Sequence, residues 1–428
     1  MITRFTKHWN LKIITNLIFM SYGTIIGPLI VMAVQPILKN TYEPSVFGML
    51  ELYTRLTSVL LVAFTLKYEI SIVNENSERR AIKMLHSIFI FGSILLIILE
   101  TIIFFTQNAI IDYFIIPIEY TFIIYLIPLS AFFLMLTKIL FYALIRGNMF
   151  NQTSIAKIGR RGLEAFSQIS LKKTFNNYGL FLGEIVGNIA SSVFMIFMLR
   201  KKLFKHKIEK LSNYLALMRE NKNIPIYVFP SDLLNVAVNS FLIILFVRNF
   251  GFESAGFLEL SLKILIIPAA LLTTSIRPIV LQTVSRACEE KKQFYSELIV
   301  LSTLSIVVGI FFSLSIFLWI ENLLNYFFSD EWNNSIVYSK ILIYPTVIQL
   351  IISPLGQILV GLKCYKLDAI LKIIKFSIFS LMFFIVSETE IELLVIYSAL
   401  TIVFYIIYGL VIFYKSREYH RSILLKNA

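Results

Sequence analysis

The sequence has few charged residues and almost no cysteine. Only 15% of its 428 residues are charged and 57% are apolar, whereas soluble domains usually run near 45–50% apolar and about 25% charged. This balance excludes a soluble globular enzyme and a disordered chain. The two cysteines, Cys288 and Cys364, provide neither a disulfide scaffold nor a metal-ligand cluster.

The motifs of common catalytic sites are also missing. The chain has no Walker lysine loop and no GxGxxG, HExxH or GxSxG pattern. Its four histidines form no ligand pair by spacing. The outside connections between apolar runs are all short, which leaves no room for an extramembrane catalytic domain. We therefore expect no enzyme, no cofactor and no metal, and a function that is carried out within the bilayer.

Long apolar runs fill the chain instead. A helix needs roughly 20 apolar residues to cross the hydrocarbon core, and uninterrupted runs such as residues 88–105 contradict the alternating pattern of a membrane barrel. We predict an all-α polytopic membrane protein with about 12 transmembrane helices. The expected spans are residues 14–37, 47–70, 84–106, 121–145, 153–171, 177–199, 224–247, 255–283, 296–320, 336–360, 368–387 and 393–414.

Basic residues divide unevenly between the connecting segments. If the N-terminus is cytoplasmic, 25 of the 39 Lys and Arg residues fall in inside segments, four in outside segments and ten within spans. Such an excess follows the positive-inside rule. Because the number of spans is even, we expect both termini in the cytoplasm.

A short internal repeat links the two halves of the chain. Residues 46–56 are similar to residues 254–264, and the identical pairs include Gly48/Gly256 and Glu51/Glu259. The repeat predicts two six-helix bundles, residues 1–199 and 224–428, around a central cavity. The basic segment 200–223 is then a cytoplasmic linker that we expect to act like a hinge.

Cations within the predicted spans form the candidate site. A charge near the bilayer centre costs at least about 2.5–3.5 kcal/mol, so these side chains should face a wet cavity or a partner. For those near span ends, snorkelling to the membrane surface is the open alternative. The ten are Arg55, Lys138, Lys157, Arg160, Arg161, Lys263, Arg277, Lys340, Lys372 and Lys375. Carboxylates that could couple an ion or neutralise a cation are fewer: Glu51, Glu100, Glu164 and Glu259.

Spacing predicts which of these charges share a helix face. Residues four apart can pair, which applies to Glu51/Arg55, Arg160/Glu164 and Glu259/Lys263. In the span 153–171 the polar residues recur every three or four positions and form one stripe, as expected for a cavity lining. The alternative is an interfacial helix whose cations snorkel to the membrane surface. A surplus of cations fits an anionic cargo such as a pyrophosphate or an acidic sugar, because guanidinium and ammonium groups bind phosphate oxygens.

Several segments resemble those of bacterial polysaccharide flippases. Residues 42–50, which contain Tyr42, Pro44 and Phe47-Gly48, are similar to a Y-x-P-x-x-F-G turn of that family, and Tyr68-Glu69 begins its YE-x-x-I motif. Further matches are Leu234-Asn235, residues 255–257, and Ser353-Pro354-Leu355 followed by Gln357. The chain thus resembles the O-antigen or capsule flippases of the multidrug/oligosaccharidyl-lipid/polysaccharide exporter superfamily.

The resemblance implies a cargo and a location. An undecaprenyl-pyrophosphate-linked oligosaccharide would be turned from the cytoplasmic to the outer leaflet of the bacterial inner membrane by alternating access. The expected partners are this lipid-linked oligosaccharide, membrane lipids, and the polymerase and chain-length proteins of the pathway, with no nucleic acid. The alternative function is an ion-coupled small-molecule or drug exporter of the same superfamily, for which buried carboxylates and aromatic cages should dominate.

Overall fold

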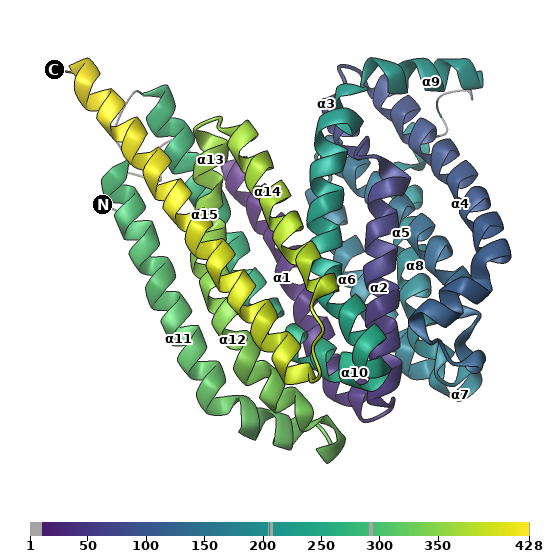
Figure 1. Ribbon diagram of the computed structural model, residues 1–428. Coiled ribbons are helices and arrows are strands. Elements are labelled where there is room, and N and C mark those ends of the chain that lie inside the picture. Colours follow the sequence, from purple (N-terminus) through teal and green to yellow (C-terminus); the bar gives the residue numbers. More distant parts are fainter. Residues whose placement is uncertain (1–10, 204, 206–208, 291–293, 428) are drawn as a thin grey trace. The chain divides into compact units, whose positions relative to one another are not determined.

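The computed structural model describes residues 11–203, 205, 209–290 and 294–427, and every regular element in these ranges is helical (Figure 1). In lipid, backbone N–H and C=O groups have no water to bind, and a helix satisfies both kinds of group within one segment. The predicted all-α membrane fold is confirmed.

Each predicted span corresponds to a helix. Nine helices of the described residues are long and apolar enough to cross a membrane, and α10 (Asn223–Glu289) contains two of the predicted spans. The two parts of α10 meet at Gly251, whose φ of 86° is strained for any residue with a Cβ. Two predicted spans form helices that are not among the nine, because α6 (Phe150–Ser170) is too polar and α14 (Tyr365–Ser380) is too short.

The chain folds into two compact units. The first comprises the residues up to Tyr42 together with Leu52–Val236, and the second comprises Glu43–Glu51 and the chain from Ala237 onward. Both α2 (Pro44–Thr65) and α10 therefore contribute residues to each unit. The domain limits predicted from the sequence, at 199 and 224, stay a prediction.

Helix α6 lies at the centre of the packing in the first unit. It packs against α1 and α8, and α5 packs against α8 and α4. Phe64, Met84, Met135 and Met195 are fully buried in the apolar core of this unit. The remaining elements are α1 (Leu11–Lys39), α3 (Glu69–Asn74), α4 (Glu78–Phe114), α5 (Ile123–Arg146), α7 (Lys172–Phe175), α8 (Tyr178–Leu203) and α9 (Leu211–Glu220), with the short helix η2 (Ile118–Tyr120) before α5.

Helix α12 has the corresponding place in the second unit, where it packs against α11 and α15. Ile358, Leu359 and Val280 are buried in its core. Exposed apolar side chains, such as Phe105 on α4 and Phe311 on α11, are what a helix facing hydrocarbon requires. The elements after α10 are α11 (Tyr295–Phe327), η3 (Asp330–Trp332), α12 (Asn334–Ile352), η4 (Ser353–Gly356), α13 (Gln357–Gly361), α14, η5 (Leu381–Phe384) and α15 (Glu390–Asn427).

The first turns of the two repeat copies pack directly on each other within the second unit. A Cβ added at Gly48 would lie 2.8 Å from the carbonyl carbon of Phe252, and one added at Gly256 would lie 2.7 Å from the carbonyl carbon of Pro44. Pro44 and Phe252 are themselves equivalent positions of the repeat, so the contact is reciprocal, as in an interface with two-fold symmetry. Glycine at both positions allows the helix backbones to touch.

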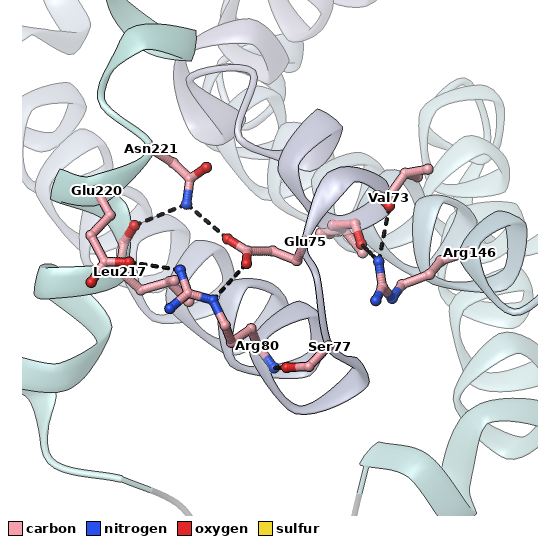
Figure 2. A network of polar contacts seen from close by, with 9 residues as sticks. Val73, Glu75, Ser77, Arg80, Arg146, Leu217, Glu220 and Asn221 are labelled. Atoms are coloured by element: carbon pink, nitrogen blue, oxygen red, sulfur yellow. Dashed lines mark hydrogen bonds and ion pairs between the residues drawn. The ribbon is translucent and has the colours of Figure 1, made fainter.

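The basic segment 200–223 contains helix α9, which is fastened to the first unit. Glu75, just before α4, accepts hydrogen bonds from Arg80 Nε at 2.7 Å and from Asn221 Nδ2 at 2.8 Å (Figure 2). Arg80 also pairs with Glu220, at 2.6 Å. These bonds tie the end of α9 to the first turn of α4, so the described part of the expected hinge-like linker is docked on a bundle.

A second group of contacts anchors the start of α9. Glu209 pairs with Arg79 and Lys83, each at 2.9 Å. Hydrogen bonds from Lys83 and Arg79 lower the pKa of the Glu209 carboxyl to about 2. At neutral pH this carboxylate is therefore fully ionised and holds two cations of α4.

Candidate functional site

The polar stripe of α6 lies between α1 and α8 in the first unit. Lys157 Nζ donates to Thr24 Oγ1 of α1 at 3.2 Å and lies 5.5 Å from the centre of the Phe141 ring. At the other end of the stripe Gln168 is buried, and its Nε2 donates to the Leu180 carbonyl of α8 at 3.0 Å. The stripe thus contacts α1 at one end and α8 at the other, with Lys157 half-buried and Gln168 buried.

One ion pair in this stripe differs from the prediction. Spacing predicted Arg160 with Glu164, whereas Arg161 Nη1 reaches both carboxylate oxygens of Glu164, at 2.9 and 2.8 Å. Arg160 Nε is buried and has no hydrogen-bond partner among the described residues. The Arg160 carbonyl faces α8, where a Cβ on Gly187 would lie 2.8 Å from it. Arg160 is half-buried and forms no ion pair among the described residues, and the Glu164 and Glu184 carboxylates act on its charge from a greater distance.

A second charged cluster surrounds the break between α2 and α3. Lys138, predicted as a site cation, pairs with Glu69 at 2.7 Å, and the Glu69 side chain is completely buried. Lys67 lies 3.9 Å from the same carboxylate and also pairs with Asp232. Leu66 and Lys67 have positive φ values of 44° and 64° and form the turn that directs Glu69 inward.

Sequence analysis identified only one member of this cluster as a site residue. Lys67, Glu69 and Asp232 were missed, because no helical spacing links them to Lys138. The one available signal is the Tyr68-Glu69 motif, which indicates the family resemblance but does not by itself indicate a buried carboxylate. In the structure, two cations and two carboxylates compensate each other here.

Charges of the second unit fall into paired and unpaired groups. Glu259 and Lys263 form the predicted pair on α10, with the carboxylate buried. Lys372 pairs with Asp368 at 2.8 Å, and Lys340 pairs with Glu321 at 2.9 Å near the surface. Local carboxylates therefore compensate these three predicted site cations.

Lys375 has a different environment. Its Nζ lies 5.8–5.9 Å from the ring centres of Phe379, Phe404 and Tyr405, and it has no ion pair among the described residues. Ring faces attract cations, but only weakly compared with a carboxylate. Lys375 is thus an ammonium group held among aromatic rings, with its charge uncompensated by any described carboxylate.

Arg277 lies on the same unit and contacts a sequence motif noted above. Its Nη2 donates to Ser353 Oγ at 2.6 Å, at the start of η4 and of the Ser-Pro-Leu motif. A hydroxyl is a neutral acceptor, so this hydrogen bond does not compensate the positive charge of the guanidinium. The remaining predicted residues, Arg55, Glu51 and Glu100, are buried or half-buried on α2 and α4.

Comparison with known proteins identifies the family. Residues 42–337 match the family described as polysaccharide biosynthesis protein. The chain belongs to this family. A comparison with curated proteins finds no significant match.

The fold of this polysaccharide biosynthesis family member is shared with solved transporters. It superposes on an inward-facing multidrug resistance MATE transporter of the MOP superfamily with a TM-score of 0.74, at 12% identity over 95% of this chain and 99% of that one. The lipid II flippase MurJ, in an inward closed conformation, gives 0.71 at 15% identity over 96% and 90%. A MOP superfamily transporter from Pyrococcus furiosus gives 0.62 at 13% identity over 96% of each chain.

The chain is therefore a multi-pass membrane protein with the fold of MOP superfamily flippases and exporters. Family membership rests on the sequence match, and the solved structures, all of low identity, establish the fold alone. Within that fold, the structure separates compensated cations from uncompensated ones, a distinction that composition cannot provide.

Proposed function

We propose that this protein flips lipid-linked oligosaccharides across the bacterial inner membrane for surface polysaccharide biosynthesis. The cargo would be an undecaprenyl-pyrophosphate-linked repeat unit of an O-antigen or capsule, transferred from the cytoplasmic to the outer leaflet by alternating access. Both termini would lie in the cytoplasm, and a polymerase and chain-length proteins would act on the product.

One observation carries this proposal beyond family membership. Lys157, Arg160 and Lys375 are half-buried cations that form no direct ion pair with a carboxylate among the described residues. An uncompensated cation in a membrane is costly unless an anion reaches it. A pyrophosphate or an acidic sugar supplies that anion, and arginine and lysine are suited to bind its oxygens.

The likeness to MATE transporters supports a second candidate, an ion-coupled exporter of small molecules or drugs. An organic cation would need carboxylates that are free to bind it. In the described residues, Glu69, Glu164 and Glu259 each pair with a cation of the chain. This arrangement favours an anionic cargo over a cationic one.

Deletion and complementation test the function in cells. Loss of the gene should stop surface glycan display and leave lipid-linked units on the inner leaflet. In complementation, Lys375→Met and Arg160→Met should each lower export about tenfold or more, because each removes a charged hydrogen bond to the cargo. Lys340→Met and Lys372→Met are the matched controls and should export normally at equal protein abundance.

Reconstituted vesicles distinguish the two functions. The purified protein should transfer a labelled undecaprenyl-pyrophosphate oligosaccharide between leaflets and should not move a fluorescent organic cation. Transport of the organic cation alone, or normal surface glycan in the deletion strain, would contradict the proposal.

A further inference from the structure

The first unit contains a cavity that is separate from the charges discussed above. Its volume is about 540 Å³, within the range of small-molecule sites. The end of α3, the first turns of α4 and α6, and the last turns of α5 and α8 surround it. The distribution of basic residues assigns this end of the helices to the cytoplasmic side.

Arg146, at the end of α5, provides one positive charge of the cavity lining. Its Nη1 donates to the carbonyl oxygens of Ile72 at 3.2 Å and Val73 at 2.9 Å (Figure 2). These bonds orient the guanidinium on the last carbonyls of α3. Its hydrogen-bond acceptors are neutral carbonyls and the Glu75 carboxylate acts on it only through space, so the guanidinium has no direct ion pair among the described residues and can bind an anion in the cavity.

Lys202 and Glu78 form the charged rim of the same cavity. Lys202 Nζ lies 3.1 Å from Glu78 Oε2, and both side chains are more than 40% exposed. An exposed pair of this kind contributes little to stability. Lys202 can therefore exchange Glu78 for a phosphate with little loss of folding free energy. The cavity lining as a whole has two cations, Arg146 and Lys202, and one carboxylate, Glu78.

The floor of the cavity is apolar. Ala81 of α4, Ala143 of α5 and Leu199 of α8 line it and are otherwise buried in the protein. A cavity with cations at its rim and apolar groups at its floor matches a molecule that joins a phosphate to a hydrocarbon part. Basic pockets between transmembrane helices on the cytoplasmic side are known to suit anionic lipid headgroups.

We propose that this cavity binds the phosphate headgroup of an anionic phospholipid of the inner leaflet. Arg146 and Lys202 bind the phosphate oxygens, and the glycerol and upper acyl carbons pack on Ala81, Ala143 and Leu199. The same phosphate chemistry could come from a soluble source such as inorganic pyrophosphate, which the experiment separates. The site does not depend on which cargo the protein carries.

Binding is measured on the purified full-length protein in nanodiscs. Nanodiscs of phosphatidylethanolamine with phosphatidylglycerol or cardiolipin are compared with phosphatidylethanolamine alone, and retained lipid is counted by native mass spectrometry. Inorganic pyrophosphate is titrated in parallel. The native protein should retain the anionic lipid and should not bind pyrophosphate with comparable affinity.

Three variants locate the site without disturbing the anchoring of Arg146. Lys202→Gln should weaken retention of the anionic lipid about fivefold, the effect of one cation near a membrane surface. Ala143→Met should abolish retention by filling the cavity while all charges stay. Lys201→Gln removes a neighbouring exposed cation that does not line the cavity and should leave retention unchanged.

Several results would overturn the assignment. Equal loss in the Lys201 and Lys202 variants would indicate general surface attraction, and undiminished retention by Ala143→Met would place the lipid elsewhere. Binding of pyrophosphate with no selectivity for anionic lipid would make the site one for a soluble anion. Thermal unfolding of each variant checks that it remains folded.

Discussion

Removing one partner of the buried pair between Lys138 and Glu69 should cost the first unit several kcal/mol of stability. Glu69→Gln removes the carboxylate but keeps its shape, and leaves the Lys138 ammonium without its partner at 2.7 Å. Breaking a buried pair in this way typically costs about 3–5 kcal/mol. Because the Lys138 side chain is 24% exposed and can recruit some water, we expect a value near the lower end.

Replacing both partners should restore most of that loss. In Glu69→Gln/Lys138→Met no ammonium is left uncompensated, and the methionine fills the space of the lysine stem. Substituting a whole buried pair by neutral groups is often close to neutral, so the double variant should lie within about 1 kcal/mol of the native protein. Lys67 keeps its pair with Asp232 in every variant.

Thermal unfolding of the purified protein in detergent measures this cycle. For a unit of this size, a loss of about 3 kcal/mol corresponds to a fall of about 6–12 °C in the unfolding midpoint. Glu100→Gln is a control on α4, and it should change the midpoint only slightly, because Glu100 forms no ion pair with any residue that the structure describes. A native-like midpoint for Glu69→Gln, or a double variant less stable than either single one, would refute the reasoning.

Two further predictions concern the packing of the repeat and the docking of α9. Gly48→Ala and Gly256→Ala should each destabilise the protein by about 1–3 kcal/mol, because the new Cβ meets backbone atoms across the repeat contact. Gly162→Ala, with no atom within 4 Å of its added Cβ, should be neutral or stabilising in the same unfolding assay. A Gly48→Ala variant as stable as the native protein would contradict the close contact. Because the pKa of Glu209 is lowered to about 2, its contribution is complete above the unfolded value of about 4.5 and is lost as the pH falls through about 2. The protection of amides 209–222, taken relative to the intrinsic exchange rate at each pH, should therefore be high at pH 7 and fall below pH 4. Unchanged protection at pH 2 would show that the carboxylate does not hold the segment.

The helices could be predicted because hydrocarbon thickness determines how long an apolar run must be. Every predicted span corresponds to a helix, including the two that Gly251 joins within α10. The repeat was also visible in the sequence, since Gly48 and Gly256 fit a contact that excludes any side chain. What limits prediction is the long-range contact: the partner of Lys138 is Glu69, on another helix.

Helical spacing had mixed success with the charges because it considers a single helix. It identified the Glu259 and Lys263 pair, whose partners share one face of α10. It selected Arg160 rather than Arg161 as the partner of Glu164, although three- and four-residue separations both bring side chains together. The choice between them depends on the packing of α6 against α8, which the sequence of α6 alone does not contain.

The basic segment 200–223 makes contacts that its net charge does not indicate. Its expected role as a hinge-like cytoplasmic linker stays a prediction. Its few carboxylates determine its position, since Glu209 and Glu220 pair with arginines and a lysine of the first turns of α4. Over the described residues, these ion pairs hold α9 against the first turns of α4.

Cargo binding should follow charge compensation rather than the number of cations. An anion that binds Lys372 must compete with Asp368, whereas one that binds Lys375 only has to displace weak ring contacts. The two lysines lie three residues apart on α14, so comparing Lys372→Met with Lys375→Met contrasts a paired, 42% exposed cation with a cation on the same helix that lies among aromatic rings and has no ion pair among the described residues. If both variants transport equally well, or the Lys372 variant is the more impaired, then uncompensated charge does not identify the cargo site in this fold.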